Sequence, residues 1–144
     1  MVKRILVIDD DEAIRKVMLL ALESTPYQVD TVGSGAEAVD LARSESYDLV
    51  YLDLKMPDLN GIESLRALRR VAPDVRVYFM TAYYGDYLDE LRALRTEGEH
   101  FELIKKPLNM RQIVDYTRAI IDGGGLIGAA KASPDDTPPL LGPA

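Results

Sequence analysis

The chain has 144 residues, 47% of them hydrophobic, which is typical of one globular domain with a single core. Its formal net charge of −7 argues against a direct nucleic-acid surface, because such surfaces need clustered Lys and Arg. The absence of cysteine excludes disulfides and thiolate metal sites. Acids appear by position 9, and no apolar run reaches membrane-spanning length, so we expect a cytoplasmic protein without membrane contact.

Short apolar runs alternate with helical periodicity along the chain. In chain order we predict a strand Arg4 to Ile8, a helix with Ile14 to Leu22 on its apolar face, a strand Gln28 to Val32, a helix capped by Ser34, a strand Leu49 to Leu52, a helix from Asn60-Gly61 to Ala72, a strand Val75 to Met80, a helix Tyr84 to Arg95, a strand Phe101 to Ile104 and a helix Asn109 to Ile121. This alternation predicts an α/β domain with a parallel sheet covered by helices on both faces, because parallel strands need crossover connections.

The last part of the chain has a different composition. Residues 123–144 contain nine of the eighteen Gly and Pro residues and show no periodicity. We therefore expect a globular domain over residues 1–122, followed by a flexible tail or a truncated linker over residues 123–144.

Chemically active side chains follow four of the five predicted strands. Asp9 and Asp10 follow the first strand, Asp53 the third, Thr81 the fourth and Lys106 the fifth. Ligands of open parallel sheets bind outside the carboxyl ends of the strands, so we expect these side chains to meet at one rim.

Carboxylates gathered in this way suit a hard divalent cation. Mg²⁺ prefers oxygen ligands, and the absence of nearby His or Cys disfavours zinc or copper. A bound Mg²⁺ would offset the repulsion among the acids and present a phosphate donor to one carboxylate acting as nucleophile. Lys106 and Thr81 could then bind the transferred phosphoryl group.

The same residues carry a family resemblance. Asp9-Asp10, the block from Asp53 to Gly61 (DLKMPDLNG), Thr81-Ala82 and Lys106-Pro107 resemble the receiver domain of two-component response regulators, over roughly Lys3 to Asp122. The resemblance implies the flavodoxin-like strand order 2-1-3-4-5. It also implies a signalling switch that catalyses its own phosphorylation and dephosphorylation and turns over no external substrate.

Site roles follow from the resemblance position by position. Asp53 matches the phosphorylated aspartate. Asp10 matches a direct Mg²⁺ ligand, Asp9 an acid that reaches the metal through water, and the backbone carbonyl of Lys55 the third protein ligand; Mn²⁺ would also fit. Thr81 matches the switch hydroxyl and Lys106 the lysine that pairs with the phosphoryl group, before an expected cis bond to Pro107.

The resemblance also implies partners. These are a sensor histidine kinase or phosphotransfer protein upstream, and a protein target or a missing C-terminal effector domain downstream. Phosphorylation-dependent homodimerisation is one of the outcomes the family allows. Output would pass through the face made by the fourth helix, the fifth strand and the fifth helix.

The sequence departs from the family pattern in two ways. Leu103 stands where relatives usually carry a switching aromatic residue, and Phe101, on the same strand face, is a candidate substitute. The segment from Thr81 to Lys106 is about three residues longer than usual, with Glu97 to His100 in the added region. Lys55 and Tyr83, at the positions that adjust phosphoryl lifetime, are bulky, which suggests a long-lived phosphorylated state.

Alternatives remain open at this point. The acids at 9 to 11 could cap the first helix, a role that suits Asp11 or Glu12 better than Asp9 or Asp10. The domain could be a receiver-like scaffold that binds partners without phosphorylation, or a Mg²⁺-dependent phosphatase of the haloacid dehalogenase type, although Ala13 does not fit that motif. Tyr83, Tyr84 and Tyr87 could form a partner surface or pack partly into the core.

Overall fold

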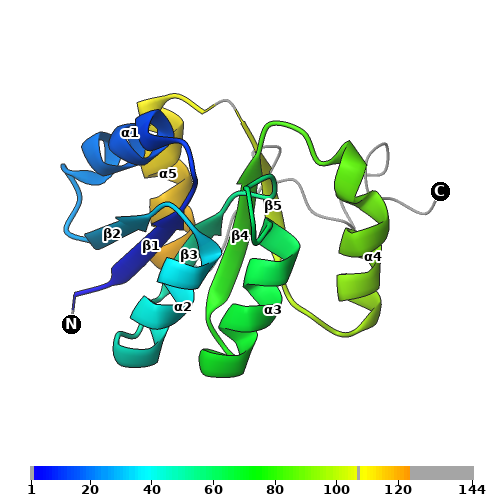
Figure 1. The fold of residues 1–144 in the computed structure, drawn as a ribbon. Coiled ribbons are helices and arrows are strands. Elements are labelled where there is room, and N and C mark those ends of the chain that lie inside the picture. Colours follow the sequence, from blue (N-terminus) through cyan, green and yellow to red (C-terminus); the bar gives the residue numbers. More distant parts are fainter. Residues whose placement is uncertain (1, 107, 124–144) are drawn as a thin grey trace.

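The computed structural model describes residues 2–106 and 108–123. Five parallel strands form one sheet in the order β2-β1-β3-β4-β5, as predicted (Figure 1). The strands are β1 (Arg4–Ile8), β2 (Gln28–Val32), β3 (Leu49–Leu52), β4 (Arg76–Thr81) and β5 (Glu102–Lys105). The helices are α1 (Glu12–Leu22), α2 (Gly35–Ser44), α3 (Gly61–Val71), α4 (Leu88–Thr96) and α5 (Met110–Ile121), with a short 3₁₀ helix η1 (Gly85–Tyr87) before α4.

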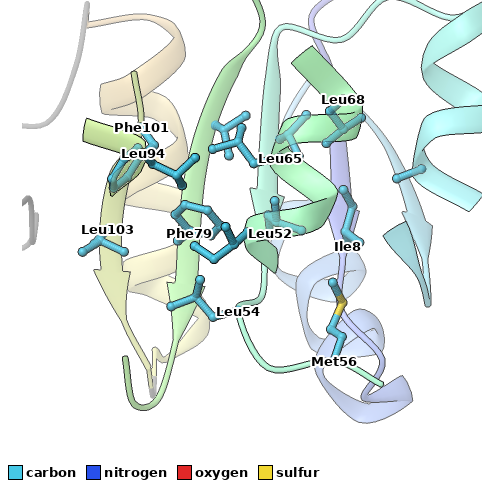
Figure 2. Packing of buried hydrophobic residues seen from close by; sticks show 14 of the residues in the cluster. Ile8, Leu52, Leu54, Met56, Leu65, Leu68, Phe79, Leu94, Phe101 and Leu103 are labelled. Carbon is cyan, nitrogen blue, oxygen red and sulfur yellow. The ribbon is translucent and has the colours of Figure 1, made fainter. Parts of the chain in front are cut away.

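Alternation along each strand divides the core into two layers. One cluster joins one side of the sheet to α2, α3 and α4, and includes Ile8, Leu52, Phe79, Leu65 and Leu94 (Figure 2). The other joins the opposite side to α1 and α5, and includes Val7, Tyr51, Met80, Met18 and Ile113. Both faces of the sheet are therefore covered, and only its edges and strand ends face solvent.

Capping residues fix where several helices begin. Asp11 accepts a hydrogen bond from the Ala13 amide at the start of α1, and Ser34 caps α2. Asn60 and Asn109 each form a reciprocal capping box, with Glu63 and Gln112, at the starts of α3 and α5. The helix-capping interpretation of the acids at 9 to 11 is thus confirmed for Asp11.

The predicted helix from Tyr84 to Arg95 begins later than expected. Residues 85–87 form η1, and α4 starts only at Leu88, with no side-chain cap at either start. Tyr84 and Tyr87 have non-helical backbone angles, which apolar periodicity alone does not reveal. The strands β4 and β5 are each displaced by one residue toward the C-terminus relative to the prediction.

The residues between α4 and β5 are held against α3. Gly98 has φ +90°, which lets the chain turn sharply after α4. Arg66 pairs with Glu97, and Arg69 pairs with Glu99 and donates to the His100 carbonyl at 2.7 Å. His100 thus lies in the connection between α4 and β5, and two arginines of α3 anchor that connection.

Candidate functional site

The register of the central strands sets the position of the acids. Ile8 of β1 pairs with Leu52 of β3, so the next residues, Asp9 and Asp53, leave the sheet side by side. The Asp53 amide donates to the Ile8 carbonyl at 3.0 Å, which continues the strand pairing one step beyond β3. The predicted convergence at the carboxyl ends of the strands is therefore a consequence of register.

Three carboxylates gather at this rim. Asp9, Asp10 and Asp53 each offer an oxygen atom, and these atoms all lie within 4.8 Å of one another. Asp9 is 2% exposed and Asp53 9%, whereas Asp10 is exposed. Carboxylate oxygens are ligands that Mg²⁺ prefers, so this cluster is a candidate site for that ion.

Lys106 reaches into the acid cluster from the end of β5. Its Nζ lies 2.7 Å from Asp9 Oδ2 and 3.7 Å from Asp53 Oδ1, and its side chain is 15% exposed. The Lys106 amide donates to the Thr81 carbonyl at 2.8 Å, which fixes where its side chain begins. Lys105 beside it is exposed, as expected for a solvated lysine.

Burial raises the pKa of the Asp53 carboxyl to about 6, and the nearby charges of Asp9 and Asp10 act in the same direction. The Lys106 ammonium and the Leu54 amide oppose this effect, because both stabilise the ionised carboxylate. Asp53 is thus a partly desolvated carboxylate whose charge is costly without a cation.

Asp9 is the most completely bonded residue of the site. Its amide donates to the Val32 carbonyl at 3.1 Å, and its Oδ1 accepts from the Asp11 amide at 2.9 Å. Its own carbonyl accepts from Arg15 Nη1 at 2.7 Å. Sequence reasoning missed Arg15, because an arginine on a helix carries no signal that it reaches back to the preceding strand end.

Gly61 closes the loop that follows Asp53. A Cβ at position 61 would lie 2.3 Å from the Asp53 backbone oxygen, so only glycine allows this approach. The Gly61 amide donates to the Leu54 carbonyl at 2.8 Å. In the same loop Asp58 has φ 63°, a left-handed conformation that Asp tolerates better than most residues.

Thr81, the last residue of β4, is 2% exposed. Its hydroxyl donates to the Tyr83 carbonyl at 3.3 Å. Tyr83 is 63% exposed, whereas Tyr84 is buried and Tyr87 is partly buried against the same core cluster. Of the three tyrosines, Tyr84 and Tyr87 therefore pack in the core, whereas Tyr83 faces solvent.

Leu103 and Phe101 both lie in the core cluster between the sheet and α4 (Figure 2). Leu103 is 0% and Phe101 4% exposed. Phe101 packs edge-on against Phe79, with 5.4 Å between ring centroids, and the guanidinium of Arg95 lies 5.2 Å from its ring centre. The two switch candidates therefore share a face, as expected from their spacing.

Comparison with known proteins identifies the family. The model of the response regulator receiver domain matches residues 5–118. The chain belongs to this family. It is 35% identical over 118 residues to a transcriptional regulatory protein, a CpxR homolog of Haemophilus influenzae, covering 82% of this chain and 50% of that protein. It is also 32% identical over 133 residues to the response regulator MprA of Mycolicibacterium vanbaalenii, covering 92% of this chain and 53% of that protein.

Solved structures show the same fold. A CheY-like receiver domain protein of Methanospirillum hungatei has a TM-score of 0.74 at 28% identity, covering 85% of this chain and 96% of that one. The response regulator TrrA of Thermotoga maritima, in complex with Mg(2+)-BeF, has a TM-score of 0.68 at 30% identity, covering 83% of this chain and 99% of that one. This receiver chain spans about half the length of the curated relatives it matches. Phosphorylation-dependent signalling is the role of the family.

Among the described residues, no helix is both long and apolar enough to cross a membrane. The predicted tail over residues 123–144 and the expected cis bond to Pro107 lie outside the described residues, Gly123 excepted.

Proposed function

We propose that Asp53 of this receiver domain accepts a phosphoryl group in a Mg²⁺-dependent reaction. The observation that carries the proposal is the position of Asp53: it lies within 4.8 Å of Asp9 and Asp10, and Lys106 stands 3.7 Å away. A carboxylate that is costly to ionise yet close to two further acids and one ammonium suits a nucleophile that works with a cation.

The donor set fits a magnesium ion. Asp10, Asp53 and the Lys55 backbone carbonyl would hold it, with Asp9 reaching it through water, and Mn²⁺ could replace it. When bound, the ion would neutralise the charge that gathers on the phosphoryl oxygens during transfer. The complex of TrrA with Mg(2+)-BeF supports this assignment for a relative of 30% identity.

In the transfer, an Asp53 oxygen forms the new bond to phosphorus while the bond between phosphorus and the donor atom breaks. The leaving group keeps the electron pair; for a phosphohistidine donor this is the imidazole nitrogen. Lys106 now pairs with Asp9 at 2.7 Å, and it would turn to pair with a phosphoryl oxygen, which is a strong acceptor.

Thr81 would couple the phosphoryl group to the rest of the domain. Its hydroxyl now donates to the Tyr83 carbonyl at 3.3 Å, a long bond that is easily exchanged for one to a phosphoryl oxygen. The exchange would release the loop before α4 and shift a pre-existing equilibrium at the α4-β5-α5 face. Leu103 and Phe101, which are buried beneath α4, would repack in that shift.

Lys55 and Tyr83 are proposed to lengthen the phosphorylated state. Both side chains are exposed and stand at the two positions that adjust its lifetime in the family. They could move over the acyl phosphate and exclude the water that hydrolyses it. Small polar residues at both positions should then speed dephosphorylation, and an unchanged hydrolysis rate would refute the role.

The proposed phosphodonor is a histidine kinase or phosphotransfer protein. A hollow of about 430 Å³ beside Lys106 is lined mainly by apolar residues, including Ile14, Val17, Met80 and Ile113. Val17 is 37% exposed, so a partner helix could cover it. The output is proposed to be a protein target or an effector domain beyond the matched region, with residues 1–122 forming the receiver unit and residues 123–144 a tail or linker.

The scaffold alternative keeps one observation in its favour. Leu103 is fully buried and lacks the ring expected at the switch position, so binding without phosphorylation would not need it. The two readings differ in how the α4-β5-α5 face responds to a phosphoryl mimic.

Beryllofluoride with Mg²⁺ tests the site directly. Wild type, Asp53→Asn and the matched loop variant Asp58→Asn would be compared by amide NMR spectra and by thermal melting. The proposal predicts that wild type and Asp58→Asn gain stability and shift signals at Thr81 and along α4, whereas Asp53→Asn does neither. Stabilisation without shifts in α4 would favour the scaffold, and no stabilisation would refute the site.

A further inference from the structure

Asp10 has no support for its own side chain. Among the described residues its carboxylate makes no hydrogen bond or ion pair, and it is exposed. Its place beside Asp9 and Asp53 therefore depends on the backbone that carries it. The peptide group joining residues 9 and 10 is the link that carries Asp10 away from the end of β1.

Arg15 holds this peptide group. Its Nη1 donates to the Asp9 carbonyl at 2.7 Å, reaching back from the first turns of α1 toward the end of β1. Asp9 is the first residue beyond β1, and among the described residues its carbonyl bonds to no neighbouring strand. The Arg15 guanidinium satisfies this carbonyl instead. Because the carbonyl lies in the plane of the 9–10 peptide, fixing it fixes the direction in which Asp10 leaves the strand.

Gly33 provides the space for the guanidinium. A Cβ at position 33 would lie 3.2 Å from Arg15 Nη1 and 3.6 Å from its Cζ. Position 33 immediately follows β2, whose last residue, Val32, accepts the Asp9 amide bond at 3.1 Å. The carbonyl of Asp9 is thus held by Arg15, whose guanidinium lies where a side chain at position 33 would press on it.

We propose that Arg15 is a positioning residue for the divalent-cation site, acting through the Asp9 carbonyl rather than by contact with the ion. The inference rests on the proposed Mg²⁺ site. The proposal and simple electrostatics predict opposite effects of losing Arg15 on the affinity for the cation. A positive charge near a cation site weakens binding, so loss of charge alone would tighten it. Loss of the positioning bond would instead let Asp10 move, and cation binding would weaken.

Lys16 offers a matched control. It is the next residue and carries the same charge. Among the described residues it pairs only with Glu12, at 3.3 Å, and both side chains are 70% exposed. Arg15→Gln and Lys16→Gln therefore change the net charge equally, but only Arg15→Gln removes the bond to the Asp9 carbonyl. Gly33→Ala keeps all charges and presses on the guanidinium, and Arg15→Lys keeps the charge with one donor group.

The experiment titrates Mn²⁺ into each metal-free variant and measures the free ion by its electron paramagnetic resonance signal. Arg15→Gln should weaken Mn²⁺ binding about ten-fold, the usual size of the effect when a group that orients a metal ligand is lost. Gly33→Ala should weaken it less, Arg15→Lys should recover part of the loss, and Lys16→Gln should leave it unchanged or slightly tighter.

Two results would overturn the inference: binding to Arg15→Gln as tight as to Lys16→Gln, or Gly33→Ala without effect while Arg15→Lys binds as weakly as Arg15→Gln. If Arg15→Gln fails to fold, Gly33→Ala and Arg15→Lys decide the question on folded protein. A wild type that binds no Mn²⁺ would instead refute the proposed metal site.

Discussion

The ammonium of Lys106 lies 2.7 Å from Asp9 and 3.7 Å from Asp53, so one cation is shared by two nearly buried carboxylates. This arrangement makes Lys106 the counter-charge of the acid cluster. A divalent ion at the same rim would replace Lys106 as the counter-charge, because it would neutralise the carboxylates more completely than one ammonium can. Lys106 would then be available to a phosphoryl group.

Lys106→Met should therefore destabilise the metal-free domain. Removing one partner leaves Asp9 buried and unpaired, which costs about 3 kcal/mol in unfolding free energy. Added Mg²⁺ should stabilise Lys106→Met more than wild type, since the ion replaces the missing charge. Urea denaturation with and without Mg²⁺ measures both effects. Equal stabilisation of the two proteins by Mg²⁺ would contradict the shared role of lysine and metal.

Asp53→Asn should stabilise the metal-free domain at neutral pH. Burial raises the pKa of Asp53 from its ordinary value of 3.8 to about 6 in the folded state, so ionisation costs the folded state more than the unfolded one. The wild type should lose stability, relative to the variant, as pH rises from about 3.8 to about 6, and the difference should vanish below that window.

The size of this effect is limited. A shift of two units corresponds to at most about 3 kcal/mol, and solvent at the partly exposed carboxyl reduces it further. Urea unfolding in the presence of a chelator, across this pH range, gives the difference. A variant less stable than wild type at neutral pH would show that the pairing with Lys106 outweighs burial.

Tyr84→Phe should stabilise the domain. Tyr84 is 1% exposed, and its hydroxyl has no hydrogen-bond partner among the described residues. Phenylalanine keeps the ring in the core and removes the unpaired polar atom, a gain of about 1 kcal/mol. Thermal melting of the variant and of the exposed control Tyr83→Phe checks this. A loss of stability specific to Tyr84→Phe would show that its hydroxyl is bonded in solution.

Replacing the two arginines of α3, Arg66 and Arg69, by alanine should lower the free energy of unfolding by different amounts. Arg69 is 12% exposed in its side chain and bonds to Glu99 and to the carbonyls of Val75 and His100. The side chain of Arg66 is 40% exposed and, within the part of the chain that the structure describes, pairs only with Glu97. Arg69→Ala should cost about 2 kcal/mol because it removes three hydrogen bonds, of which those to Glu99 and Val75 are partly buried, whereas Arg66→Ala should cost less than about 1 kcal/mol. Equal losses in urea midpoints would contradict this division.

Much of the fold follows from local pattern. Apolar runs bounded by turn residues located β1, β2 and β3 at their observed limits, and side-chain caps located the starts of α2 and α3. The start of α4 was misplaced, because Tyr84 is apolar and correctly spaced yet lies outside the helix as a core residue. Apolar periodicity indicates which residues are buried, but it does not distinguish a buried loop residue from a buried helical one.

The sequence predicts the site residues that directly follow strands. It does not predict those that reach the site through a long side chain on a helix. The gathering of Asp9, Asp10 and Asp53 follows from parallel strands in register. The bond from Arg15 to the Asp9 carbonyl and the space at Gly33 depend on how α1 packs against the loop after β2, and no local pattern encodes that packing.

The most direct test of the account is the intact mass of the protein after incubation with Mg²⁺ and acetyl phosphate, for wild type, Asp53→Asn and Asp58→Asn. We predict the gain of one phosphoryl group in wild type and Asp58→Asn, its absence in Asp53→Asn, and its loss when a chelator removes the metal. An unmodified wild type, or an Asp53→Asn variant modified to the same extent, would contradict Asp53 as the phosphorylated residue.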